Sequence, residues 1–119
     1  MQPVNLFLTF YFVDSRNLDE IHELVGRALT CHFAVFETDE YRDEQRYRAY
    51  VFGMRLMLEY VDSWDNLNVY RLAGSAFPAE FTDDSPKISL DHHVSNLLRR
   101  FDINTFYTIE EYRRQAELR

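Results

Sequence analysis

Cysteine and glycine are scarce in this 119-residue sequence, and their scarcity excludes several kinds of site. A single cysteine, Cys31, rules out an intramolecular disulfide and gives no sign of an oxidising compartment. The 3 glycines are not clustered, so the sequence has no phosphate-binding loop of the G-x-G-x-x-G or Walker type. Cys31 lies at the end of a predicted amphipathic helix, so we expect it to be a small buried hydrophobic residue rather than a nucleophile.

Long apolar runs are also missing, and acidic residues outnumber basic ones. No run approaches the roughly 18 residues of a membrane-spanning helix, and Asn5, Thr9 and Asp14 interrupt the apolar start that a secretory signal requires. The 20 acidic and 13 basic side chains give a formal net charge of -7. Because nucleic acids and anionic membranes are bound by Lys and Arg that neutralise phosphates, we expect neither as a partner. We expect a cytoplasmic protein with a basic partner instead.

No recognisable catalytic or metal-binding motif is present. His92 and His93 are adjacent, so on a helix their side chains point about 100° apart, unlike the i, i+4 histidines of H-E-x-x-H. No serine lies in a G-x-S-x-G context, although the members of a Ser/His/Asp triad need not be close in sequence. We therefore expect no catalytic residues, no metal and no cofactor.

Hydrophobic periodicity predicts a single α+β domain over residues 1–119. Asn17, Ser89 and Thr108 are the expected N-caps of three helices. The predicted strands cover residues 4–13, 32–37, 45–52, 54–60 and 67–73, and the predicted helices cover 18–29, 90–101 and a short segment after 108. This order is typical of an antiparallel β-sheet packed against two main helices plus a short C-terminal helix.

Gly53 lies between two stretches of alternating apolar residues. Gly53 interrupts the alternation of residues 45–52, and residues 54–60 then continue with period 2, so we favour a bulge or kink in one long bent strand over a tight turn. The turn-forming residues from Asp62 to Asn66 then predict a hairpin with the strand that follows.

Two segments combine acidic and aromatic residues in a way that favours binding to a protein. Residues 37–44 hold five carboxylates around a tyrosine, and a second turn places acids beside the only Trp. Trp, Tyr and a few desolvated charges dominate interface energetics. The alternatives are that 37–44 is a solvated connection and that the Trp covers the core beneath the hairpin. The candidate partner-binding residues are Asp39, Glu40, Tyr41, Asp43, Glu44, Asp62, Trp64 and Asp65.

Three stretches resemble the immunity proteins of bacterial contact-dependent inhibition and polymorphic toxin systems. They are Phe36–Tyr41, Tyr47–Ala49 and Phe52–Leu58, and the match covers residues 24–75. In those proteins a Phe, a Ser and a Tyr lead into a glycine-rich turn, which a tyrosine strand and a Gly-centred apolar strand follow. Residues 42–44, Arg-Asp-Glu, stand where those proteins have the glycines, so this chain departs from the pattern at the turn.

The resemblance implies a small, acidic, cytoplasmic protein that neutralises a cognate toxin domain by binding it, without catalysis of its own. The expected toxin is a nuclease with a basic substrate cleft, and the expected oligomeric state is a monomer. Two alternatives come from other classes. One is a small-ligand-binding or enzymatic domain with an aromatic-lined pocket, and the other is an adaptor or assembly subunit that dimerises through a sheet edge.

Overall fold

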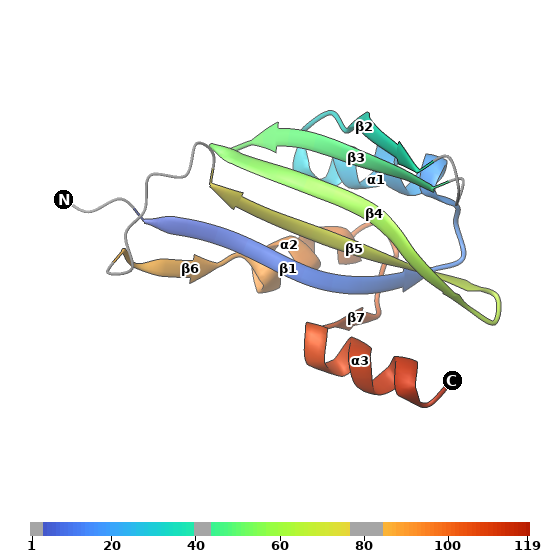
Figure 1. Cartoon of the computed structure of the whole chain (residues 1–119). Helices are drawn as coiled ribbons and strands as arrows, with labels where there is room; N and C mark the ends of the chain where they lie inside the picture. The colour runs from blue at the N-terminus through green and yellow to red at the C-terminus, as the bar shows by residue number, and fades with distance from the viewer. Residues whose placement is uncertain (1–3, 40–43, 77–84) are drawn as a thin grey trace.

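A mixed sheet with helices on both faces makes up the molecule. The computed structural model describes residues 4–39, 44–76 and 85–119, and within them the chain forms seven strands and three helices (Figure 1). In chain order the elements are β1 (Asn5–Asp14), α1 (Leu18–Leu29), β2 (Ala34–Asp39), β3 (Glu44–Val51), β4 (Met54–Trp64), β5 (Leu67–Ala76), β6 (Lys87–Ser89), α2 (Asp91–Arg99), β7 (Phe106–Tyr107) and α3 (Ile109–Glu117). The α+β class predicted from the sequence is confirmed.

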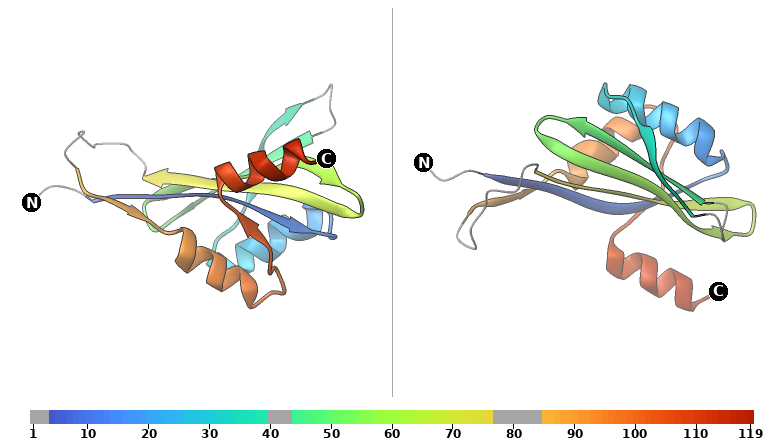
Figure 2. Two further views of the ribbon diagram at one scale, coloured as in Figure 1. Left: turned by 90° about the horizontal axis from the view of Figure 1, so that it is seen from below. Right: turned by 45° about the horizontal axis from the view of Figure 1, so that its top comes forward.

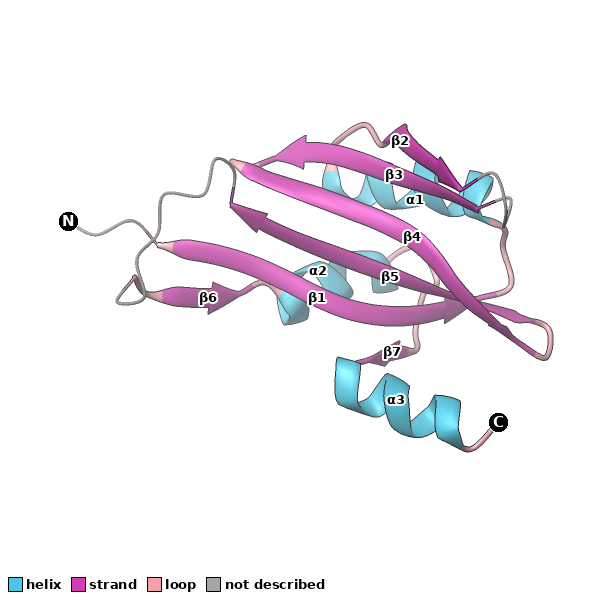
Figure 3. Ribbon diagram, viewed as in Figure 1, coloured by secondary structure: helices cyan, strands magenta, loops and turns pink. Residues whose placement is uncertain are grey.

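The sheet has the strand order β2-β3-β4-β5-β1-β6, and β7 also pairs with β1 (Figure 3). Every neighbouring pair is antiparallel except β1 and β6, which run parallel. Strands β6 and β7 share one edge of β1. Between them the backbone N–H of Thr9 donates to the Asp91 carboxylate at 2.8 Å, so the side chain at the start of α2 replaces a strand partner there.

Helices α1 and α2 cover one face of the sheet, and α3 lies on the opposite face, which we call the outer face (Figure 2). The main core lies between the sheet and α1 and α2. It includes the buried residues Leu8, Phe10, Phe12, Ile21, Leu24, Val25, Leu29, Tyr47, Ala49, Leu56, Leu58, Tyr70, Leu72, Val94 and Leu98. Each large side chain buried in this way contributes about 1.5–3 kcal/mol. No helix within the described residues is long and apolar enough to cross a bilayer.

Two of the three predicted helix caps are confirmed. The Asn17 side chain accepts from the backbone N–H of Glu20, and Thr108 forms a reciprocal capping box with Glu111. The third expectation is wrong, because Ser89 is the last residue of β6 and the N-cap of α2 is Leu90, which makes no side-chain cap bond. The Ser89 hydroxyl still accepts from the N–H of Asp91 at 3.2 Å.

Gly53 belongs to a tight turn and not to the bent strand that we favoured. Val51 pairs with Met54, so Phe52 and Gly53 form a two-residue hairpin loop with φ angles of 54° and 70°. Two successive positive φ angles are the conformation that matches the twist of such hairpins. The paired residues Val51 and Met54 point to the same face, so the buried positions change from odd numbers in β3 to even numbers in β4.

Candidate partner-binding surface

The two acidic segments singled out in the sequence belong to hairpins that point to the same end of the sheet. The β2–β3 pairing ends at Asp39 opposite Glu44, and the β4–β5 pairing ends at Trp64 opposite Leu67. Strands β3 and β4 are antiparallel neighbours, so the start of β3 and the end of β4 lie at one end of the sheet (Figure 1). We call this the hairpin end.

Helix α1 also begins at the hairpin end, because it directly follows β1, whose last residue pairs next to the β4–β5 hairpin. Its first turn carries the exposed acids Asp19 and Glu20. The Tyr47 hydroxyl donates to Asp19 at 3.3 Å and so ties the start of α1 to β3. The sequence analysis missed these two carboxylates. The sequence contained a signal for them, because both follow the predicted N-cap Asn17 and acidic residues are favoured in the first turn of a helix.

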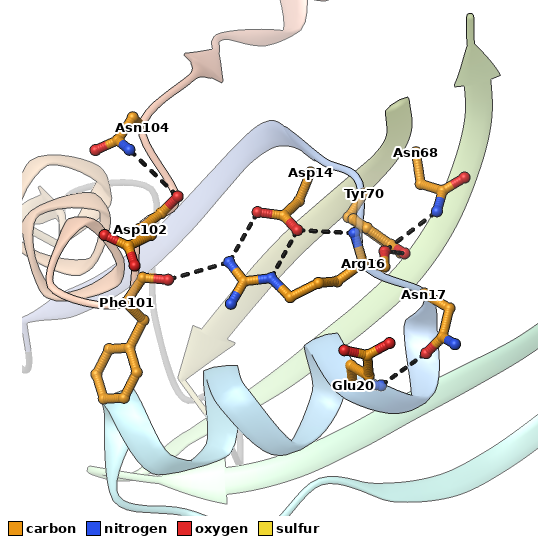
Figure 4. Close-up of polar contacts among 9 residues, drawn as sticks. All are labelled: Asp14, Arg16, Asn17, Glu20, Asn68, Tyr70, Phe101, Asp102 and Asn104. Carbon is orange, nitrogen blue, oxygen red and sulfur yellow. Dashed lines mark hydrogen bonds and ion pairs between the residues drawn. The ribbon is translucent and has the colours of Figure 1, made fainter. Parts of the chain in front are cut away.

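A polar network fixes the connection between β1 and α1 (Figure 4). The Arg16 guanidinium donates to both Asp14 carboxylate oxygens, at 2.7 and 2.8 Å, and to the Phe101 carbonyl at 3.0 Å. The Arg16 carbonyl in turn accepts from the Tyr70 hydroxyl at 2.6 Å and from the Asn68 amide at 3.1 Å. The network therefore joins this connection to β5 and to the turn after α2, and it gives the hairpin end a rigid base.

Burial and hydrogen bonding shift the pKa values of the titratable groups in this network. Burial raises the pKa of the Asp14 carboxyl, but hydrogen bonds from the Arg16 side chain and backbone, together with its charge, outweigh burial and leave the pKa below 3.8. Burial raises the pKa of Tyr70 to about 12, although a hydrogen bond with Asn68 opposes the rise. At neutral pH the carboxylate is therefore charged and the phenol is protonated, as the observed hydrogen bonds require.

Trp64 faces α3 and is only 5% exposed. Its ring stacks on Tyr112 at 5.6 Å, contacts the edge of Tyr107, and lies under the Arg119 guanidinium at 4.4 Å. It packs with Val13 in a small core on the outer face. The ring therefore covers the sheet, which was the alternative interpretation of this Trp, and it is not presented to a partner.

The two acids beside Trp64 differ in their surroundings. Asp62 is half-buried, and its carboxylate accepts the Trp64 indole N–H at 3.0 Å. Asp65 has a side chain that is 90% exposed and lies 3.4 Å from Arg119. An exposed ion pair of this kind contributes little to stability, so Asp65 remains accessible to a partner.

Two of the remaining candidate residues lie at the paired ends of β2 and β3. Asp39 is the last residue of β2 and Glu44 is the first residue of β3. Glu40, Tyr41 and Asp43 lie outside the described residues. The described ends of β2 and β3, Asp39 and Glu44, therefore lie at the hairpin end.

Two cavities bear on the alternative of a small-molecule site. The first, of about 210 Å³, lies between α1, α2 and the β3–β4 turn and has an almost wholly apolar lining. Ligand sites usually add a few convergent polar groups to such a lining. The second is an open groove of about 800 Å³ along α1, lined in part by Glu23, His32 and Cys31. Burial raises the pKa of the Cys31 thiol, the opposite of what an activated nucleophile needs.

In the part of the chain that the structure describes, no three His, Cys, Asp or Glu side chains gather in a way that would hold a metal ion. No family model, curated protein or solved structure matches the chain.

Proposed function

We propose that this chain is an immunity protein that binds a cognate bacterial toxin domain in the cytoplasm and neutralises it by covering its active or substrate-binding surface. The observation that carries the proposal is the meeting of two acidic hairpins and the acidic start of α1 at one end of the sheet. The resemblance of residues 24–75 to immunity proteins supports the same function.

Electrostatics supports a basic cleft as the target of the hairpin end. A net charge of -7 attracts a basic surface from a distance, and carboxylates on hydrogen-bonded hairpins occupy such a cleft in place of substrate phosphates. Complementary charge of this kind raises association rate constants toward about 10⁸–10⁹ M⁻¹s⁻¹ at low salt. Fast capture is what protection from a toxin requires, so a nuclease domain with a basic cleft fits this surface best.

The rigid base of the hairpin end adds to this argument. The Asp14–Arg16 network and the Asp19–Tyr47 hydrogen bond hold the β1–α1 connection against the sheet before any partner arrives. A surface that is already ordered loses less conformational entropy on binding. The order of this connection, and of the acidic start of α1 that follows it, suits an inhibitor that must bind tightly.

We expect the open reading frame upstream of this chain to encode a large secreted protein with a variable C-terminal toxin domain, and the test uses that domain. The domain is expressed in bacteria with and without the chain, and binding of the purified pair is measured by biolayer interferometry. We expect co-expression to restore growth and the pair to bind. Growth arrest in the presence of the chain, together with no binding, would overturn the proposal.

A charge-reversal variant locates the surface. Reversing the charge of Asp39, Glu40, Asp43 and Glu44 to Lys is expected to slow association with the toxin domain while the far-ultraviolet circular dichroism spectrum is unchanged. If the variant associates as fast as the wild type, the β2–β3 hairpin is not part of the interface, and the toxin is bound elsewhere.

A further inference from the structure

Helix α3 covers only part of the outer face of the sheet. It is held there by Tyr112, whose ring stacks on Tyr11 at 4.2 Å and on Trp64. Farther from the hairpin end, no helix of the described chain lies over this face (Figure 2). Two cross-strand rows occupy the uncovered area, and they consist of Thr9, Ala73, Met57 and Arg48 in one row and Phe7, Ser75, Arg55 and Tyr50 in the next.

Arg48 is held in the uncovered area by aromatic rings. Its guanidinium lies 4.9 Å from the Phe36 ring centroid and 5.5 Å from that of Tyr50, which is itself 54% exposed. A guanidinium that stacks on rings keeps the N–H donors at its edge free for a planar acceptor. Among the carboxylates whose side chains the structure describes, none is paired with Arg48. The face therefore presents a positioned cation.

The neighbouring row shows how this face holds a carboxylate. Glu59 lies between two arginines of the adjacent strands, with one oxygen 3.2 Å from Arg46 Nε and the other 3.0 Å from Arg71 Nη1. Arg46 and Arg48 are two residues apart on β3, so their side chains point to the same face. One row along from Glu59, Arg48 is thus a third arginine, and its cross-strand neighbours are the apolar Met57 and the small Ala73.

We infer that the uncovered outer face is a docking surface for a carboxylate-rich segment of a protein partner, with Arg48 as its anchor. Arg and Tyr are the residues most enriched among those that dominate protein interfaces, and Arg binds a carboxylate through two parallel hydrogen bonds. A nucleic acid is disfavoured, because its binding requires many phosphates to be neutralised, and Arg48 and Arg55 are the two cations of these rows. This surface is distinct from the hairpin end, whose charge has the opposite sign.

The experiment measures fluorescence anisotropy with three labelled probes at low salt. They are a peptide of alternating Glu and Leu, the same peptide with Lys in place of Glu, and a single-stranded oligothymidylate. Arg48→Glu is compared with Arg99→Glu, a matched control on α2, where Arg99 stacks on Phe106 at the same distance of 4.9 Å. Thermal unfolding of both variants shows whether they retain the fold.

We expect the acidic peptide alone to bind, the Arg48→Glu variant to lose about ten- to a hundred-fold in affinity, and the control to bind as the wild type does. Arg48→Lys, which keeps the charge and loses the planar fork, is expected to show an intermediate loss. Equal affinities for wild type and Arg48→Glu, or no binding of the acidic peptide, would overturn the inference. Binding of the oligothymidylate in place of the peptide would assign the face to nucleic acid. None of these outcomes depends on whether the toxin domain binds.

Discussion

Trp64 and Tyr112 stack nearly parallel, with 5.6 Å between ring centroids and 12° between ring planes. One ring belongs to the end of β4 and the other to α3, so this pair attaches the C-terminal helix to the outer face. The Trp64 indole N–H is satisfied by Asp62 at 3.0 Å. The end of β4 and the C-terminal helix are therefore packed together. Fluorescence of the only Trp of the chain can be used to follow this packing.

Replacing Tyr112 with Ala is expected to loosen α3 and to expose the Trp64 ring. We expect the free energy of unfolding to fall by about 1–3 kcal/mol, and the tryptophan emission maximum to shift to the red under conditions where the protein is folded. Arg113→Ala, a change at an exposed residue of the same helix, serves as the control. An unshifted emission maximum in Tyr112→Ala would contradict this packing.

Asp14→Asn is expected to destabilise the protein at neutral pH by about 1–3 kcal/mol, because the charged hydrogen bonds with Arg16 are weakened. The pKa of Asp14 is lowered in the folded state, so its contribution is present above the unfolded pKa and is lost as the pH falls through the folded pKa. The difference in the free energy of unfolding between wild type and variant should therefore disappear below pH 3.8. Urea unfolding at a series of pH values measures it, and a constant difference down to the acid limit would argue against the ion pair.

Tyr70→Phe removes both the hydrogen bond of the Tyr70 hydroxyl and its ionisation, and the two effects on stability appear at different pH. At neutral pH the variant loses the bond to the Arg16 carbonyl, which still accepts from Asn68, so we expect a cost of about 0.5–1.5 kcal/mol. The pKa of Tyr70 is raised from 10.0 to about 12 in the folded state, so the wild type loses stability as the pH rises through this range. The variant lacks this loss, and the two stabilities should converge at alkaline pH. Parallel curves would show that Tyr70 does not titrate as described.

Phe52→Asn is expected to stabilise the protein. Phe52 has a φ of 54°, which is unfavourable for a bulky residue, and its side chain is 78% exposed, so little burial is lost on replacement. Asn tolerates the left-handed conformation, and we expect a gain of about 1 kcal/mol in thermal unfolding. The reciprocal change Asp65→Phe, at a φ of 55° in the other hairpin, should lower stability. A loss of stability in Phe52→Asn would indicate that the ring makes a contact that outweighs the strain.

Local signals in the sequence predicted much of the fold. The alternation that defines β1 and the polar caps Asn17 and Thr108 depend on neighbouring residues alone, and the structure confirms them. Strands β6 and β7 were not predicted, because runs of 3 and 2 residues are too short to show a period. The pairing of β5 with β1 is a contact between distant segments, which periodicity does not encode.

The candidate site was predicted less completely than the fold. Composition identified the acidic hairpins, but it could not show that α3 covers Trp64, because Tyr112 and the rest of α3 follow many residues later in the chain. The cation on the outer face was missed for a similar reason. Arg48 alternates with buried residues in the sequence, yet its stacking on Phe36 depends on the pairing of β2 with β3.

The association rate constant of the chain with the toxin domain, measured by stopped flow as salt is raised, tests the central claim most directly. Glu40→Lys and Glu110→Lys change the net charge equally, but only Glu40 belongs to the segment that joins β2 to β3. We predict slower association for Glu40→Lys at low salt, a rate like that of the wild type for Glu110→Lys, and rates that converge at high salt. Equal effects of the two reversals would contradict a toxin-binding surface at the hairpin end.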